Sequence, residues 1–185
     1  MADNMRYYET FYAINTDYWG WTHGSFADHK KILVKEYINE ACNCTETSTA
    51  STTSEFLYPH HISETYFIEG VIEGHITIAC SSATSTVTSY RVTVCKVNKN
   101  TDKTELYTTG WVTVDDTLEW DSTYSIGEEA VYPFWIDAWE EQELGENDRI
   151  YVKVEVSGSN ELILWHSNDS TWQDIKITIP FKGLD

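Results

Sequence analysis

The chain of 185 residues is poor in several features that define familiar classes of protein. No run of 18 apolar residues occurs, so the sequence predicts no membrane-spanning helix. The first residues, MADNMRYYETFYAIN, contain no basic segment followed by an apolar one, and they therefore predict no signal peptide. We expect synthesis in a cytoplasm and no passage through a membrane by the usual signal.

Cysteine is scarce, with residues only at Cys42, Cys44, Cys80 and Cys95. Their spacing is not that of a small disulfide scaffold. Cys80 falls on the apolar face of its predicted strand, whereas Cys95 falls on the face opposite Val92 and Val94. If both apolar faces point into one core, these two sulfur atoms point apart and cannot bridge. The sequence therefore predicts free thiols, consistent with a reducing cytoplasm.

Basic residues are also few, since 12 Lys and Arg stand against 30 Asp and Glu and give a formal net charge of −18. Such a surface repels nucleic-acid phosphates and anionic lipids at ordinary salt. Binding to nucleic acid or to a membrane is therefore not expected. We interpret the acidity as a solubility device, with a halophilic surface as the alternative.

Aromatic and β-branched residues, by contrast, are abundant. The content of 41% hydrophobic and 14% aromatic residues excludes intrinsic disorder for most of the chain. At this length one domain is expected. The segment from Arg149 to Ser157 alternates strictly, with Ile150, Val152, Val154 and Val156 on one side. This period of two predicts a strand with one buried and one solvated face.

Similar strand patterns follow one another from residue 62 onward, separated by short turns. They are Tyr66–Cys80, which Gly70 and Gly74 interrupt, Tyr90–Val97, Thr104–Val114, Leu118–Ile126, Ala130–Ile136, Glu161–His166 and Asp174–Phe181. Asn98–Asp102 predicts the turn of a hairpin. Asp137–Leu144 is the one stretch that favours a helical turn, with Gly145 placed to end it. The pattern predicts an all-β fold, a two-sheet antiparallel β-sandwich of jelly-roll type.

The N-terminal part predicts a different organisation. Residues 1–30 are rich in aromatics without any period and are expected to form an extended arm, packed on its own domain or on a partner subunit. The candidates for an assembly interface are Tyr7, Tyr8, Phe11, Tyr12, Tyr18, Trp19 and Trp21. Residues 31–185 are predicted to form the sandwich. Within it, Lys31–Asn39 favours a strand over a short helix, and the Ser/Thr-rich residues 45–54 predict an exposed loop.

Metal-binding and catalytic patterns are weak. Cys42 and Cys44 are followed by His60 and His61, but zinc sites prefer wider Cys pairs and His residues that are not adjacent. Oxygen ligands for calcium occur at Asp115, Asp116, Glu119, Asp121, Asn147 and Asp148, where charged turns are the better interpretation. A cupin-like cluster of His60, His61 and His75 lacks the usual spacing. We predict no catalytic residue, no cofactor and no metal.

Three tryptophans are candidates for stacking against sugars, namely Trp135, Trp139 and Trp165. Sugar-binding sandwiches use exposed Trp as flat platforms. Trp at a strand end more often fills a core or anchors a subunit interface, because it buries a large area. We therefore favour a core or interface role for these residues and keep glycan stacking as the alternative.

The succession VYPFWIDAWEEQELGENDRIYVKVEVSG, followed by DIKITIPF, resembles the late strands of jelly-roll domains in virion proteins and related trimeric knobs. There a segment of the type Leu-x-x-Gly-Asp-x-Ile opens a long strand. Leu144, Gly145, Asp148 and Ile150 match it, although two residues separate Gly145 from Asp148.

The resemblance implies a non-enzymatic virion structural protein of the capsid decoration, minor capsid or head-fibre type, made in the host cytoplasm and located in the virion. It would form homo-oligomers and contact other capsid or tail proteins through its arm and sheet edges. The alternative is a carbohydrate- or receptor-binding module of an adhesin or tail.

Overall fold

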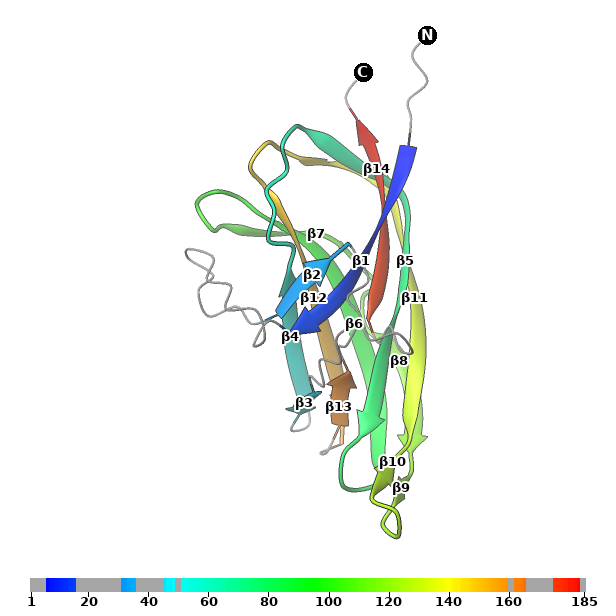
Figure 1. Ribbon diagram of the computed structural model, residues 1–185. Coiled ribbons are helices and arrows are strands. Elements are labelled where there is room, and N and C mark those ends of the chain that lie inside the picture. Colours follow the sequence, from blue (N-terminus) through cyan, green and yellow to red (C-terminus); the bar gives the residue numbers. More distant parts are fainter. Residues whose placement is uncertain are drawn as a thin grey trace.

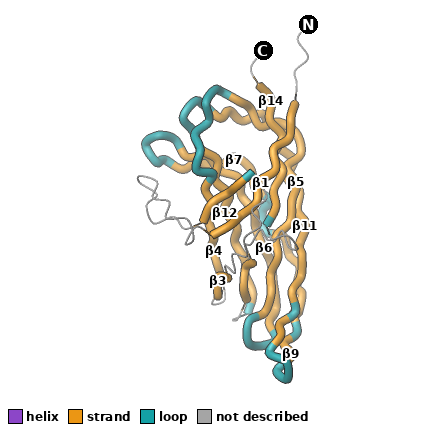
Figure 2. Tube along the Cα trace, viewed as in Figure 1, coloured by secondary structure: helices purple, strands orange, loops and turns teal. Residues whose placement is uncertain are grey.

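The structure is a computed structural model that describes residues 6–15, 31–35, 45–48, 51–159, 162–165 and 175–183. These residues form strands and their connections, and none of them is helical (Figures 1 and 2). Within the described ranges, no helix is therefore available to cross a membrane. The strands are β1 (Arg6–Asn15), β2 (Lys31–Val34), β3 (Thr45–Ser48), β4 (Ser51–Leu57), β5 (Tyr66–Cys80), β6 (Ser85–Val97), β7 (Lys103–Thr108), β8 (Val112–Leu118), β9 (Trp120–Asp121), β10 (Ile126–Gly127), β11 (Glu129–Leu144), β12 (Arg149–Gly158), β13 (Leu162–Trp165) and β14 (Lys176–Gly183).

Twelve of the strands form one hydrogen-bonded sheet. Ten of them follow the order β3-β13-β5-β14-β1-β2-β4-β12-β6-β7, and β11 pairs with β5 and β8 with β6 beside this path. The pairings are antiparallel except for one parallel contact between β2 and β4, at Ile32 and Leu57. The path bends so that the layer with β11, β5, β14 and β1 faces the layer with β4, β12 and β6 (Figure 1). The predicted all-β, antiparallel, sandwich-like fold is confirmed, and the jelly-roll type stays a prediction.

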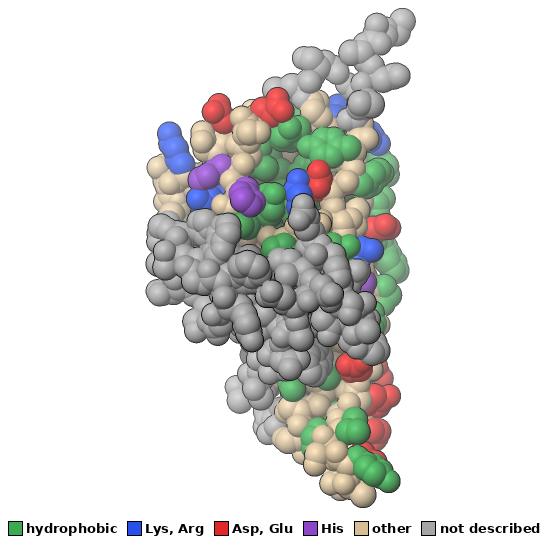
Figure 3. Space-filling model, in the orientation of Figure 1, with side chains coloured by type: hydrophobic (Ala, Val, Ile, Leu, Met, Phe, Trp, Pro, Cys, Tyr) green, Lys and Arg blue, Asp and Glu red, His purple; other side chains and the backbone are tan. Residues whose placement is uncertain are grey.

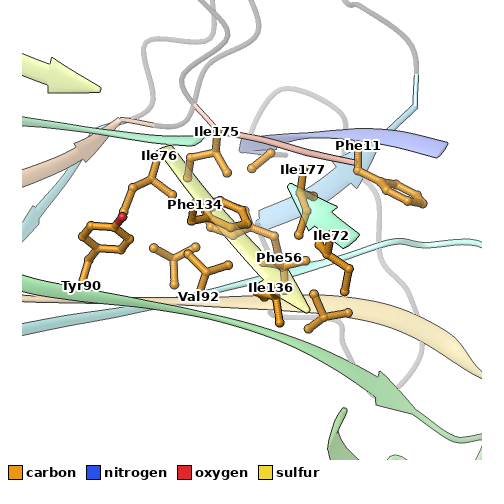
Figure 4. Packing of buried hydrophobic residues seen from close by; sticks show 14 of the residues in the cluster. Phe11, Phe56, Ile72, Ile76, Tyr90, Val92, Phe134, Ile136, Ile175 and Ile177 are labelled. Carbon is orange, nitrogen blue, oxygen red and sulfur yellow. The ribbon is translucent and has the colours of Figure 1, made fainter. Parts of the chain in front are cut away.

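The core lies between the two layers. Phe134 and Ile136 from β11 and Ile177 from β14 meet Phe56 from β4 and Val92 from β6 in one continuous cluster (Figure 4). The buried face predicted for β12 is confirmed, because Ile150, Val152, Val154 and Val156 are at most 3% exposed. The opposite face is less solvated than predicted, since Tyr151 is only 4% exposed. Cys80 and Cys95 are buried and free, as predicted.

The prediction of a helical turn at Asp137–Leu144 is wrong. β11 continues through these residues to Leu144, paired with β5 along its length. The register shifts between Ala138 and Gln142, opposite Gly70, whose φ of 139° is a conformation that glycine adopts readily. Hydrogen bonding to β5 outweighs the local preference of this acidic stretch, which the sequence alone did not reveal.

The prediction of an exposed Ser/Thr-rich loop at residues 45–54 is also wrong. Thr45–Ser48 forms β3, and Ser51–Leu57 forms β4, which pairs with β12. Ser54 lies opposite Val154 and is fully buried. Thr is a good strand former, and small hydroxyl side chains fit a paired strand as well as a loop, so polarity alone was a poor guide here.

The segment predicted as an N-terminal arm contributes a strand to the sheet. Residues 6–15 form β1, which pairs with β14 on one side and β2 on the other, and Phe11 is 1% exposed. The described part of this segment therefore packs on its own domain, one of the two outcomes that the sequence left open. Tyr18, Trp19 and Trp21 lie outside the described residues. The strand predicted from Lys31 is present as β2, Lys31–Val34.

Two predicted turns are confirmed. The β6–β7 hairpin turns at Asn98–Asp102, where the Asn98 side-chain oxygen accepts hydrogen bonds from the backbone N–H groups of Asn100 and Asp102. Between β11 and β12, Asp148 accepts a bond from the Gly145 N–H at 2.9 Å and its carboxylate lies 3.3 Å from the Lys96 ammonium. Asn147 adopts a φ of 71°, a left-handed conformation that Asn tolerates.

Candidate binding surface

The strand β11 presents large side chains on both of its faces. Tyr132, Phe134, Ile136 and Ala138 point into the core and are buried. The alternate residues point outward, and among them Val131 is 56%, Trp135 68% and Trp139 60% exposed. Hydrophobic and acidic side chains accordingly follow the side of the molecule where Figure 1 draws β11 (Figure 3). Neither tryptophan fills the core of its own chain, so the prediction of a core role is wrong for both.

The two indoles lie on the same face of one strand. They are four positions apart in the sequence, and at about 3.3 Å of rise per residue their attachment points are about 13 Å apart. This spacing suits an extended ligand that touches both rings.

A groove of about 520 Å³ runs beside Trp135 across three strands. Trp135 pairs with Glu73 of β5, which pairs with Thr178 of β14. In the neighbouring row of paired residues, His75 of β5 lies between Pro133 of β11 and Lys176 of β14. Beneath the groove, β5 and β14 approach each other too closely for a side chain at Gly74, whose Cβ would lie 2.1 Å from the Lys176 carbonyl oxygen. The groove thus combines one aromatic wall with carboxylate, hydroxyl and ammonium groups.

Charged side chains surround Trp139. The Arg6 guanidinium lies over the indole, 5.8 Å from the ring centroid, and it forms an ion pair with Glu69. The Lys182 ammonium lies 3.3 Å from Glu69 and 3.0 Å from Glu141, and hydrogen bonds to Glu141 and Glu69 raise the pKa of Lys182. The indole therefore lies beside a guanidinium that belongs to a network of ion pairs.

Tyr8 of β1 belongs to the same outer face. Phe11 points inward from β1, whereas Tyr8 points outward on the same side as Arg6 and is 63% exposed. We call the outward side chains Tyr8, Trp135 and Trp139, with the groove beside Trp135, the aromatic face. It joins one residue predicted for assembly with two predicted for glycan stacking.

The other candidate residues differ in exposure and in strand position. Tyr7 is 37% exposed at the opposite side of β1, Phe11 is in the core, and Tyr12 is half-buried. Trp165 is in β13, paired with Thr77 of β5 and Thr45 of β3. Tyr7 and Phe11 therefore do not join the aromatic face, whereas Tyr12 lies on the same side of β1 as Tyr8 and pairs with Lys176 of the groove.

Hydrogen bonds from tyrosine hydroxyls join β11 to the opposite layer. The Tyr90 hydroxyl donates to the Pro133 carbonyl oxygen at 2.7 Å, and the Tyr107 hydroxyl donates to that of Glu140 at 2.6 Å. The Tyr132 hydroxyl donates to Asp116 at 2.9 Å. Burial raises the pKa of Tyr107 to about 12, so the hydroxyl stays protonated at neutral pH. The aromatic face is therefore carried by a strand held in place on both layers.

The candidate metal ligands have structural roles where they are described. The His61 ring lies within hydrogen-bond distance of the Asn147 carbonyl oxygen and of Arg149, and Asp121 accepts bonds from the backbone N–H groups of Thr123 and Tyr124. Over the described ranges, no group of three or more His, Cys, Asp or Glu residues is arranged to hold a metal ion. Cys42 and Cys44 lie outside those ranges.

Comparisons with protein-family models and with curated protein sequences gave no match. Among solved structures, an aminopeptidase from the marine sediment archaeon Thaumarchaeota archaeon is similar over 95% of this chain and 37% of its own, with 10% identity and a TM-score of 0.54. A CocE/NonD family hydrolase from Staphylococcus aureus is similar over 95% of this chain and 37% of its own, with 9% identity and a TM-score of 0.49. The structure of infectious bursal disease virus, Gx strain, is similar over 96% of this chain and 57% of its own, with 10% identity and a TM-score of 0.30.

These similarities bear on the fold only. The chain spans little more than a third of the two hydrolase chains, and the identities are 9% and 10%. The TM-score of 0.54 shows that the archaeal aminopeptidase contains a region with a related strand arrangement. What those whole proteins do does not follow for this chain, because unrelated functions recur on one fold.

Proposed function

We propose that the protein is a non-enzymatic binding module whose contact surface is the aromatic face, and that its ligand is an uncharged glycan chain. The observation that carries this proposal is the exposure of Trp135 and Trp139, at 68% and 60%, on a strand whose other face is in the core. Two large aromatics exposed on one face of a fixed strand are typical of interaction sites, because aromatic side chains bury a large area on contact with a ligand or partner.

The surroundings of the two indoles favour a sugar over an apolar protein surface. In the groove beside Trp135, the Glu73 carboxylate offers hydrogen-bond acceptors and the Thr178 hydroxyl offers a donor. Sugar rings present apolar C–H faces to an indole and hydroxyl groups at their rims, so this mixture is complementary to them. The net charge of −18 favours a neutral glycan over an acidic one.

The test is binding to a glycan array, followed by calorimetric titration with the best neutral oligosaccharide. Trp135→Ala and Trp139→Ala should each weaken binding at least tenfold, about 1.4 kcal/mol. The matched control is Trp111→Ala. Trp111 is also an exposed tryptophan, at 50%, but it lies under the guanidinium of Arg91 from β6 and outside the aromatic face. An array without binding, or equal affinities for all three variants, contradicts the glycan proposal.

The second candidate is the virion structural role, with a neighbouring capsid or tail subunit on the same face. The observation in its favour is Tyr8, which brings an exposed aromatic from the N-terminal strand to the face. Under this candidate the sandwich is of jelly-roll type, the protein is a homo-oligomer located in a virion, and assembly buries Tyr8 and both indoles together.

Native mass measurement separates the two candidates, because a decoration or minor capsid protein assembles into particles of many copies. Tyr8→Ser is a better probe than deletion of residues 1–30, since deletion removes β1 from the middle of the sheet. Loss of particles in Tyr8→Ser, with unchanged thermal stability, supports assembly. A monomer at all concentrations contradicts it.

The absence of catalysis is likewise a proposal. The residues that the structure describes offer carboxylates and hydroxyls engaged in turns and strand pairs, as at Asp148 and Asp116. Hydrolysis of ester and peptide substrates is the appropriate assay, because two structural neighbours are named as a hydrolase and an aminopeptidase. Turnover that survives further purification contradicts the proposal.

A further inference from the structure

A second concave site lies away from the aromatic face, where β1, β12 and β14 meet the connection between β4 and β5. It is a pocket of about 290 Å³ walled by the rings of Tyr7, Phe11, Tyr58, Tyr66 and Phe181. In the view of Figure 3, hydrophobic side chains reach the surface beside histidine, lysine and acidic groups in the upper part of the molecule. We call this site the aromatic pocket.

The walls of the aromatic pocket are preformed. Phe11 and Tyr58 meet edge to face with centroids 5.2 Å apart, and Tyr7 stacks on Phe181 at 5.6 Å. Backbone bonds hold the connecting segment against the start of β12, from the Tyr58 N–H to the Ile150 carbonyl and from the Ile62 N–H to the Asp148 carbonyl. A ligand would therefore meet rings already in position.

A cation already occupies part of the pocket. The Lys35 ammonium lies 5.8 Å from the centroid of Phe11 and 5.6 Å from that of Tyr58, within the range of a cation–π interaction. It also lies 3.1 Å from the Glu9 carboxylate. Two ring faces and one carboxylate thus surround a positive charge.

The electrostatic environment of the aromatic pocket is negative, which favours the presence of the Lys35 ammonium there. Burial, and then the negative charge of Glu9, raise the pKa of Tyr58. The hydrogen bond that Tyr66 donates to Glu64 at 2.7 Å raises the pKa of Tyr66. Carboxylates at the pocket make loss of a proton unfavourable, and the same field attracts a cation. The net charge of −18 acts in the same direction at longer range.

We propose that the aromatic pocket binds a small organic cation with a methylated ammonium group, which displaces the Lys35 ammonium from between Phe11 and Tyr58. A methylated ammonium is less strongly hydrated than that of lysine and so gains more from contact with aromatic faces. The volume of about 290 Å³ lies near the lower end of ligand pockets and suits a small molecule. Lys35, whose side chain is 39% exposed, acts as an internal competitor that can swing out to water.

The test is titration of the full chain with tetramethylammonium chloride, followed by NMR, against sodium chloride at equal ionic strength. Lys35→Ala removes the competitor and should tighten binding roughly fivefold, since one cation–π contact is worth about 1 kcal/mol. Tyr58→Leu removes one ring and should weaken binding by a similar factor. A saturable shift of signals from Tyr7, Tyr58 and Tyr66 is expected in the wild type.

The matched control is Lys103→Ala. The Lys103 ammonium lies 4.9 Å from the centroid of Tyr151, a similar contact on another part of the surface, and its loss should leave the affinity unchanged. The proposal is overturned if Lys35→Ala shows no saturable binding, or if Lys35→Ala and Lys103→Ala bind equally. Trp135→Ala should not affect this titration, so failure here is distinguishable from failure of the glycan proposal.

Discussion

The inner and outer faces of β11 carry side chains of similar size into opposite environments. Phe134 and Ile136 are 4% and 5% exposed, whereas Trp135 between them is 68% exposed. Burial of the inner residues removes a large apolar area from water and stabilises the fold. The outer tryptophan contributes little to the stability of the fold, because most of its ring is in water. Substitutions on the two faces should therefore separate stability from binding.

The largest difference is expected from placing a charge on each side of the sandwich. Val154→Asp puts a carboxylate among fully buried residues of β12, where an unpaired charge costs several kcal/mol, and the domain should unfold. Val131→Asp makes the same change on the outer face of β11, where the side chain is 56% exposed, and the fold should remain. Circular dichroism distinguishes the two. A folded Val154→Asp variant would show that this face is not core.

A smaller but still large contrast is expected from removing one ring on each face. Phe134→Ala leaves a cavity in the core and should lower the free energy of unfolding by about 3–5 kcal/mol. Trp135→Ala removes a ring that is mostly in water, and its effect should stay within about 0.5 kcal/mol. Urea denaturation measures both. Equal losses from the two variants would mean that the outer indole supports the fold.

The contacts that join β11 to the opposite layer are expected to contribute less. Tyr107→Phe removes the hydroxyl that donates to the Ile68 and Glu140 carbonyl oxygens and leaves these acceptors without that donor. The free energy of unfolding should fall by about 1–3 kcal/mol. Tyr124→Phe is the control, because Tyr124 is 73% exposed and should show no change. If the two variants unfold at the same urea concentration, these bonds do not stabilise the fold.

The smallest effect is expected on the outer face of the other layer, where Arg91 forms an ion pair with Glu155. Arg91 donates two hydrogen bonds to Glu155, at 2.6 and 2.8 Å, and these lower the pKa of Glu155 below its usual 4.5. The stabilisation is present above the unfolded-state pKa and is lost as the pH falls through the lower folded-state value. Glu155→Gln should therefore cost about 1 kcal/mol at pH 7.

The cost of Glu155→Gln should shrink in acid, because protonation removes the charge of the wild-type carboxyl as well. Thermal unfolding of both proteins between pH 7 and pH 3 gives the comparison. A difference that stays constant over this range would show that the ion pair with Arg91 makes no pH-dependent contribution.

Strict alternation made some elements predictable from sequence. In β12 every second residue is Ile or Val and the residues between are mostly polar, so period and face are both visible. Residues 137–144 were different, since DAWEEQEL has no apolar period and its extended form depends on pairing with β5. Arg6–Asn15 likewise has aromatics on both sides, and only the pairing with β14 and β2 determines that Phe11 is inside.

The aromatic face was partly predictable. Trp135 and Trp139 were recognisable as candidate stacking residues, but Trp139 fell in the predicted helical turn, and Tyr132, Phe134 and Ile136 beside Trp135 are equally apolar. The sequence does not show which side another layer covers. Glu69, Arg6 and Lys182 come from β5, β1 and β14, and no local pattern predicts that they meet around Trp139. The aromatic pocket depends in the same way on five separate segments.

The tyrosine bonds to β11 also bear on solubility at high concentration. Over the described ranges β11 pairs with β5 alone, and an open strand of this length could recruit a second chain by backbone pairing and grow into fibrils. Pro133 offers no N–H group, and the carbonyl oxygens of Pro133 and Glu140 are already occupied by Tyr90 and Tyr107. These two positions make the backbone of β11 a poorer template for strand addition than a fully open edge.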